Sequence, residues 1–433
     1  MINRREFFGI TAGAGATLSL TPQLLRALND LQEQGGTLIQ RPIPSTGEKL
    51  PVIGLSFSNH AACADQAALR EVLKAFFDSG GRVLDAMHSS NRAAEEFHAT
   101  AASELGIQNK LFWSIRALVP GGPGGPPQPG AASVKPQIDT WLARTKASRM
   151  DLAMLPVAGD PTWLAALGEE KKAGRVRYIG VQTISVKFQS AQLLGLMRSE
   201  PIDFIGVDYD LSNRHVEETI LPLAQERKIG VIAFFPFSNN GGVSCSPGTR
   251  NLFARVGNAP LPEWAAEFDA KSWAQFFLKY VLSHPAVTVA RVGTTKATHM
   301  LDDIGGGVGR LPNETMRQRM AAFIDALPAL PPLPQNPAQA PGIALPAAVL
   351  DRYVGEYRAA SGFTATFRRE GDRLFVKPGT NPEVPLNARS ETRFQDPRGP
   401  FFEFQLDGQG KVTGAILEQQ GPQGAQRLQL ERK

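Results

Sequence analysis

The sequence has few of the features that mark disulfide-rich, zinc-binding or membrane-spanning proteins. It has two cysteines, Cys63 and Cys245, which stand far from any C-x-x-C or zinc-ligand spacing. They allow one disulfide, although two free thiols are the simpler interpretation. Beyond the N-terminal segment no run of about 18 apolar residues occurs, so no spanning helix is expected there. No metal site is predicted.

Charge of one sign is also not in large excess. Lys and Arg number 46 against 41 Asp and Glu, which gives a net charge of +5. The basic residues are scattered and form no run interleaved with aromatic residues, so nucleic acid is not an expected partner. At 433 residues, 42% hydrophobic and 20% charged, the composition is ordinary for a soluble protein of two or three domains.

A G-x-G-x-x-G turn is missing after the first apolar run, "PVIGL", which weakens the alternative of a doubly wound sheet. Instead, short β-branched runs alternate with segments of helical period, a pattern typical of α/β proteins. The expected strands are 51–55, 82–86, 111–117, 150–155, 176–181, 202–209, 231–237 and 287–293, and the expected helices include 65–78, 133–147, 214–228 and 264–283. Eight buried strands with crossover helices predict a parallel (β/α)8 TIM barrel over residues 36–326.

The N-terminal segment, residues 1–35, is typical of a targeting signal. In "NRREFFGITAGAGATLSL" the pair Arg4-Arg5 precedes two phenylalanines and a weakly apolar run, which is the pattern of a twin-arginine export signal. This predicts a periplasmic or exported protein and the twin-arginine translocation machinery as a partner. A flexible basic N-terminus is the alternative. Cleavage of the segment and its retention as a membrane anchor both stay open.

The C-terminal part changes character after a Pro/Ala-rich linker, residues 327–346. Residues 347–433 alternate apolar with polar side chains and carry hairpin turns at Gly371-Asp372 and at 408–410, which predicts a small antiparallel β domain. Its phrases "LDRYVGEY" and "GKVTGAILEQQG" resemble the lipocalin-like β domains appended to some exported serine hydrolases. The resemblance implies a packing or assembly module, and a homo-oligomer formed through it.

The barrel segment resembles the aldo-keto reductases over most of residues 42–325. The phrases that carry the resemblance are "RPIPSTGEKLPVIGL", "AGRVRYIGV", "PIDFIGVDY", "ILPLAQERKIGVIAFFPF" and "FFLKYVLSHPAVTVARVGTTKATHMLDDI". The resemblance implies NADP(H) as the cofactor and a small aldehyde or ketone as the substrate. Members of that family use an Asp after the second strand, a Tyr five residues later as proton donor, a Lys ending the third strand and a His ending the fourth.

Three of these four catalytic positions are changed. Asp85 is present, and the Tyr position falls on Ser90 or Asn91. Arg116 stands for the Lys; it keeps the charge and can pair with Asp85, but it cannot transfer a proton at working pH. Pro156 stands for the His and offers no side-chain donor. The tyrosine that donates the proton in that family, with its pKa adjusted by the neighbouring residues, is therefore missing.

His88, three residues after Asp85, is a candidate substitute acid because its ordinary pKa is near 6.5, and a solvated loop histidine is the simpler interpretation. The catalytic candidates are therefore Asp85, Arg116 and His88.

The cofactor contacts implied by the resemblance are mixed. The Gly-Thr that ends the first strand is Ser56-Phe57, the amide-binding Gln is Gly206, and the aromatic that stacks on the nicotinamide is kept as Phe234. The phosphate end offers Gly293, Thr294, Thr295, Lys296 and His299 near a helix start, where N–H groups favour an anion. Asp303 replaces the usual Asn, and a carboxylate there disfavours a phosphate.

Two functions follow from these residues. One is an NADP(H)-dependent oxidoreductase whose acid is an unfamiliar group or a water. The other is an exported non-catalytic binding or assembly protein on a reductase fold.

Overall fold

The computed structural model describes most of the chain after its first 36 residues. The described residues are 37–57, 65–86, 92–116, 134–157, 161–184, 186–238, 251–328, 342–360, 362–379, 383–396, 399–421 and 424–433. They form two compact units, one up to residue 328 and one from residue 342. The predicted signal and both cysteines lie outside the described residues. No described helix is both long and apolar enough to cross a bilayer.

The first unit is a closed barrel of eight parallel strands, which confirms the predicted fold and excludes the doubly wound alternative. The strands in barrel order are β3 (Ile53–Leu55), β4 (Val83–Asp85), β5 (Phe112–Arg116), β6 (Met150–Pro156), β7 (Val176–Thr183), β8 (Phe204–Asp208), β9 (Gly230–Phe234) and β10 (Val287–Val292), with β10 closing on β3. Each predicted strand run overlaps one of them, and β6, β7 and β9 extend by one or two residues beyond the predicted bounds.

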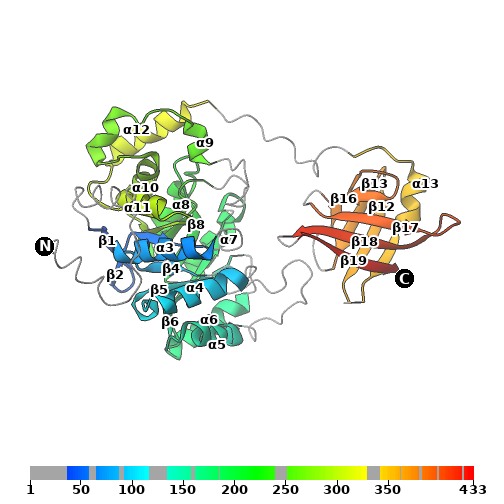
Figure 1. The fold of residues 1–433 in the computed structure, drawn as a ribbon, viewed down its shortest axis with the longest axis horizontal. Coiled ribbons are helices and arrows are strands. Elements are labelled where there is room, and N and C mark those ends of the chain that lie inside the picture. The colour runs from blue at the N-terminus through cyan, green and yellow to red at the C-terminus, as the bar shows by residue number, and fades with distance from the viewer. Residues whose placement is uncertain are drawn as a thin grey trace. The chain divides into compact units, whose positions relative to one another are not determined.

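Helices surround these strands (Figure 1). They are α3 (Gln66–Asp78), α4 (Arg92–Glu104), α5 (Val134–Thr145), α6 (Pro161–Lys172), α7 (Val186–Ser199), α8 (Val216–Glu226), α9 (Leu252–Val256), α10 (Trp273–Ser283), α11 (Ala297–Gly306) and α12 (Glu314–Asp325), with the short 3-10 helices η2 (Gln108–Lys110) and η4 (Glu263–Phe268). Side-chain caps fix several starts, because Asp65, Ser272 and Asn313 each accept a first-turn N–H.

The single helix predicted for 264–283 is wrong. The structure has η4 and then α10, separated by Asp269 in the left-handed region at φ +57°. The Asp269 carboxylate accepts hydrogen bonds from the backbone N–H and the guanidinium of Arg310, which holds this residue out of the helical conformation. Ser272 then caps the start of α10.

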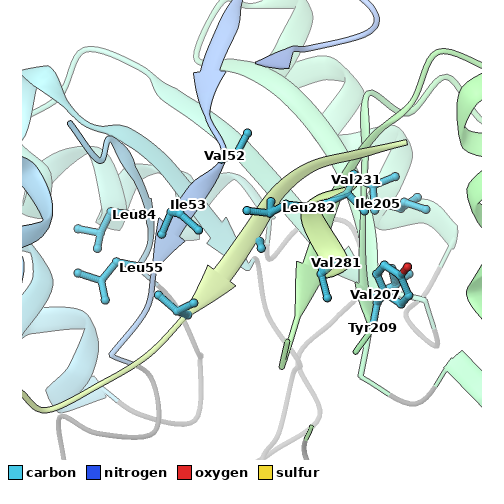
Figure 2. Close-up of a cluster of buried hydrophobic side chains, with 14 of the residues drawn as sticks. Val52, Ile53, Leu55, Leu84, Ile205, Val207, Tyr209, Val231, Val281 and Leu282 are labelled. Carbon is cyan, nitrogen blue, oxygen red and sulfur yellow. The ribbon is translucent and has the colours of Figure 1, made fainter. Parts of the chain in front are cut away.

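Alternation along the strands gives the barrel two apolar layers. Outward-facing residues such as Ile53, Leu55 and Leu84 pack toward the helices, and Figure 2 shows them beside one another on β3 and β4. Inward-facing residues form a separate interior cluster: Val83, Phe112, Leu152, Met154, Tyr178, Phe204, Ile232, Phe234 and Val289. Ile43, which follows β1 (Gln40–Pro42), and Leu50, within the paired strand β2 (Lys49–Pro51), belong to this inner cluster. The barrel is thus filled with side chains and is not a pore.

The second unit confirms the predicted antiparallel β domain. After α13 (Ala347–Leu350) and η5 (Asp351–Tyr353), nine strands form one sheet. They are β11 (Gly355–Arg358), β12 (Thr364–Glu370), β13 (Arg373–Pro378), β14 (Val384–Pro385), β15 (Asn387–Ala388), β16 (Arg393–Gln395), β17 (Phe401–Leu406), β18 (Val412–Gly421) and β19 (Gly424–Arg432). Both predicted hairpins are present, since β12 pairs with β13 and β17 pairs with β18.

The two edges of this sheet are the same stretch of chain. The strand order begins at β14 and ends at β15, and only Leu386 separates these strands in the sequence. The sheet therefore curls round until residues 384–388 join its edges, with β11 paired to β19 along the way. Figure 1 shows its orange and red strands wrapping around one another. Closure of this kind leaves no long unpaired edge.

Candidate functional site

The predicted catalytic positions gather at one end of the barrel, where the parallel strands finish. Asp85 ends β4, Arg116 ends β5 and Pro156 ends β6. The register places Asp85 beside Ser114 and Arg116 beside Met154 on neighbouring strands. This is the end at which barrel enzymes build their active sites. His88, Ser90 and Asn91 lie outside the described residues, as does the side chain of Arg116.

Asp85 forms a buried ion pair that the sequence did not indicate. Its Oδ2 accepts a hydrogen bond of 2.6 Å from Nη1 of Arg291, a residue of β10. The side chains are 1% and 6% exposed, respectively, and Ser114 Oγ lies 3.5 Å from Asp85 Oδ1. Because β3 lies between β10 and β4, the guanidinium reaches Asp85 across the barrel interior. Removing one partner would break a buried, charge-assisted hydrogen bond, which is strongly unfavourable.

Phe234 supports the same arginine. The guanidinium carbon of Arg291 lies 4.4 Å from the centre of the Phe234 ring, a cation–π distance. Phe234 is fully buried, and Phe235, which follows it at φ +54°, has its ring centre 5.3 Å from the same carbon. One face of the predicted stacking aromatic is therefore occupied by a cation from the chain itself.

Gly206 explains how the Phe234 ring fits inside the barrel. A Cβ added at Gly206 would lie 2.4 Å from Cζ of Phe234 and 2.6 Å from its Cε2. The ring thus reaches from β9 over the neighbouring strand β8 and fills the space that a side chain at 206 would need. Glycine at this position, where the resemblance implies an amide-binding Gln, is required by the present position of the ring.

The polar residues after β8 hold their own loop together. Asp208 accepts hydrogen bonds from the N–H of Val186, at the start of α7, and from the amide of Asn213. Asp210 accepts bonds from the N–H and hydroxyl of Ser212, and Arg214 pairs with Asp325. Burial raises the pKa of Asp210. These contacts make the cluster a folded turn, so we place it outside the site.

The loop 293–296 leads into the N-terminus of α11. Thr294 Oγ1 accepts the N–H of Lys296, which shapes the turn, and Lys296 occupies the N-cap without a side-chain hydrogen bond to the first-turn N–H groups. The first-turn donors and the Lys296 ammonium therefore suit an anionic group. Burial, followed by the charge of Lys296, lowers the pKa of His299, which favours its neutral imidazole.

Asp303 lies buried on the same helix. Burial, and then the neighbouring Asp302 carboxylate, raises its pKa well above the ordinary value. The shift favours the neutral carboxyl, which would not repel a phosphate as a carboxylate would. The repulsion of a phosphate that the sequence predicts for Asp303 is therefore weaker in the folded protein.

Two residues near the strand ends were missed by sequence reasoning. Arg291 lies inside the strand run "VTVARVG", and its position between small and branched apolar residues is the signal that could have marked it. His98 of α4 is fully buried, and its Nε2 accepts the N–H of Phe57 at 3.2 Å, with the two rings 5.3 Å apart. His98 thus fixes the chain just after β3.

Comparison with known families and proteins bears on the whole barrel. The model of the aldo/keto reductase family matches residues 52–322, more than half of the 433-residue chain. A domain of unknown function (DUF3471) matches residues 339–432.

Individual proteins are more distant. A probable aldo-keto reductase 1 from Glycine max is 26% identical over 178 residues, which are 35% of this chain and 48% of that protein. The chain thus spans about half the length of this curated relative. An aldo-keto reductase from Bacillus halodurans, in its holo form, gives 18% identity and a TM-score of 0.52 over 66% of this chain and 96% of its own. An aldo/keto reductase from Klebsiella pneumoniae, solved with NADP and acetate, gives 21% identity and a TM-score of 0.49 over 64% and 93%.

Proposed function

Because the chain belongs to the aldo/keto reductase family, we propose that it binds NADP(H) and acts as an oxidoreductase of small carbonyl compounds with a catalytic set altered at three positions. The observation that carries this proposal is the extent of the family match, which runs from before β3 to beyond β10 and so includes all eight barrel strands. Family membership supports NADP(H) as the cofactor.

The residues at the start of α11 fit the phosphate-bearing part of that cofactor. The open helix N-terminus and Lys296 supply N–H donors and a positive charge, while Gly293, Thr294 and Thr295 form the approach. His299, favoured as a neutral imidazole, offers hydrogen bonds rather than charge. NADP(H) supplies a hydride when it is bound, and the chain's own groups must place the carbonyl compound and provide a proton.

Proton supply is the step for which this chain is poorly equipped. A reduced carbonyl oxygen needs a proton, and a general acid typically contributes about 10²–10⁴-fold in rate. Ser90 or Asn91 stands at the tyrosine position, and Pro156 has no side-chain donor. In the proposed arrangement Asp85 orients Arg116, and His88 or a water gives the proton. We expect slow or absent turnover of simple aldehydes.

The direct test is NADPH oxidation with a panel of aldehydes, ketones and sugars. Turnover that disappears in Asp85→Asn or His88→Ala would support a rebuilt acid in the loop after β4. Robust turnover that survives changes at Asp85, Arg116 and His88 would place the active site elsewhere. A matched control is His215→Ala, which removes a histidine of the β8–α8 connection.

A second candidate is an exported, non-catalytic binding or assembly protein on the same fold. The observation that favours it is the ion pair of Asp85 with Arg291, which engages, inside the barrel, the one family catalytic residue that the chain keeps. Its signature would be nucleotide binding, seen by calorimetry, with no turnover of any carbonyl in the panel.

Export is part of the proposal for both candidates. The motivation is Arg4-Arg5 before Phe7-Phe8 in the proposed twin-arginine signal. Changing both arginines to lysine should hold a tagged protein in the cytoplasm, whereas unchanged export would contradict the signal.

The curled C-terminal sheet supports a lipocalin-like description of residues 347–433, and we propose that it serves packing or homo-oligomer formation. A change in sedimentation after its removal would test this, with tryptophan fluorescence showing that the barrel stays folded.

A further inference from the structure

The nicotinamide end of the proposed cofactor site differs in fit from the phosphate end. The family resemblance assigns two contacts to the nicotinamide: stacking on the aromatic at Phe234 and an amide bond to the side chain at 206. Gly206 has no side chain, and the space beside it holds the Phe234 ring.

The Phe234 face carries Arg291. The guanidinium carbon lies 4.4 Å from the ring centre, close to the separation at which a flat ligand ring would stack. The arginine is held there by the 2.6 Å bond to Asp85, in a place where the two charged side chains are 6% and 1% exposed. A nicotinamide could take the same face only by displacing a buried cation from its counter-ion.

Charge adds to the steric argument. The oxidised nicotinamide ring is itself a cation, and placing it at the position of a guanidinium brings two like charges together. The reduced ring is neutral but has the same shape, so it meets the same obstruction. The Phe234 ring cannot move away from Arg291 to make room, because its edge already lies against Gly206.

We infer that the chain does not hold a nicotinamide ring against Phe234, and that a bound dinucleotide is recognised through its adenosine bisphosphate half at the start of α11. This inference rests on the proposed binding of NADP(H), and it identifies the part of that molecule that the protein recognises. It also gives a structural reason for low turnover, because the hydride donor would not be positioned beside Asp85.

Calorimetry on the full chain with four probes tests the inference. These are NADP+, NADPH, adenosine 2′,5′-bisphosphate and nicotinamide mononucleotide. We expect the first three to bind with dissociation constants within about threefold of one another, and the mononucleotide not to bind. NADPH fluorescence should change little on binding, because the reduced ring stays in water. Dissociation constants for NADP+ or NADPH more than about 30-fold below that of the bisphosphate would overturn the inference.

Two variants distinguish a wrong inference about the Phe234 face from a wrong assignment of NADP(H) as the cofactor. Asp85→Asn with Arg291→Leu removes both charges together and clears the Phe234 face, so NADPH should gain affinity over the bisphosphate and show enhanced fluorescence. An unchanged ratio would count against the role of Arg291. Lys296→Ala should weaken all three adenine-containing probes equally. If no probe binds the parent protein, the proposed cofactor is wrong and the inference fails with it.

Discussion

The two units of this protein are both built around curled sheets, and their interiors are filled in different ways. The parallel barrel has an apolar interior cluster that gives way, at the ends of the strands, to the ion pair of Asp85 and Arg291. The antiparallel sheet is filled by aromatic rings: Tyr353, Tyr357, Phe367, Phe394, Phe402 and Phe404 are all buried. In that second interior, Phe404 is in contact with Tyr353, at 4.2 Å between ring centres, and with Phe367, at 4.9 Å.

This contrast distinguishes a unit that carries a functional site, the barrel, from a unit that serves as a scaffold, the antiparallel sheet. Rings packed at these distances stabilise the second unit. A buried arginine and carboxylate contribute less to stability than apolar side chains of similar volume would, so their presence at the strand ends needs another reason. That position is also where barrel enzymes place their chemistry. We therefore expect function in the first unit and support from the second.

The largest effect is expected when the ion pair is broken on one side. Arg291→Leu removes the guanidinium that donates to the buried Asp85 carboxylate and should destabilise the barrel by about 3–5 kcal/mol. Adding Asp85→Asn should recover much of that loss. Urea unfolding followed by tryptophan fluorescence measures this in the barrel alone, because all five tryptophans (Trp113, Trp141, Trp163, Trp264 and Trp273) lie in that unit. Equal losses in the single and double variants would mean that the pair is not coupled.

The same pair shows what the sequence could and could not predict. Each barrel strand was predictable because buried parallel strands produce short, continuous β-branched runs. The site was predictable at Asp85, since the end of a strand and its place in the family pattern are local properties. The partner was not, because Arg291 lies 206 residues away and reaches Asp85 through the closure of β10 on β3. The break before α10 was missed for a similar reason, since Arg310 holds Asp269 from outside the local segment.

A ring removed from the second interior should give an effect of similar or slightly smaller size. Phe404→Ala deletes a buried ring with contacts on several sides and should destabilise the C-terminal unit by about 3–5 kcal/mol. Phe401→Ala is the matched control, because Phe401 lies on the same strand, is only partly buried and rests against Arg393. Calorimetry should show a shift in one unit while tryptophan fluorescence of the barrel stays unchanged. A shift in both would contradict the independence of the two interiors.

A smaller effect is expected on ligand binding. Lys296→Ala should weaken NADP(H) binding by about 1.5–3 kcal/mol, the contribution of one hydrogen bond to a charged group. Lys377→Ala, an exposed lysine on β13 of the second unit, is the control and should leave affinity unchanged. Calorimetric titration measures both. Equal weakening by the two changes would point to general electrostatic attraction and would remove the distinction between site and scaffold.

The smallest effect is a pH dependence that should belong to the barrel alone. All six histidines precede residue 300, so the second unit has none. His284 follows α10 as its C-cap, and its Nδ1 accepts the N–H of Ala286, which requires that nitrogen to be unprotonated. Burial, followed by the nearby charge of Arg317, lowers its pKa to about 4 from 6.5, while the charges of Glu217 and Glu314 act in the opposite direction. Between these values the unfolded chain binds a proton that the folded chain does not, so barrel stability should be fully present above about pH 6.5 and fall as the pH drops toward 4.

Urea unfolding at several pH values, read by tryptophan fluorescence, should show this slope. His284→Asn keeps an acceptor without a titrating group and should flatten the slope in part, leaving the contribution of His299, whose pKa is lowered as well. A slope that the variant does not change would assign the pH dependence to other groups, and a matching slope in the second unit would contradict the comparison itself.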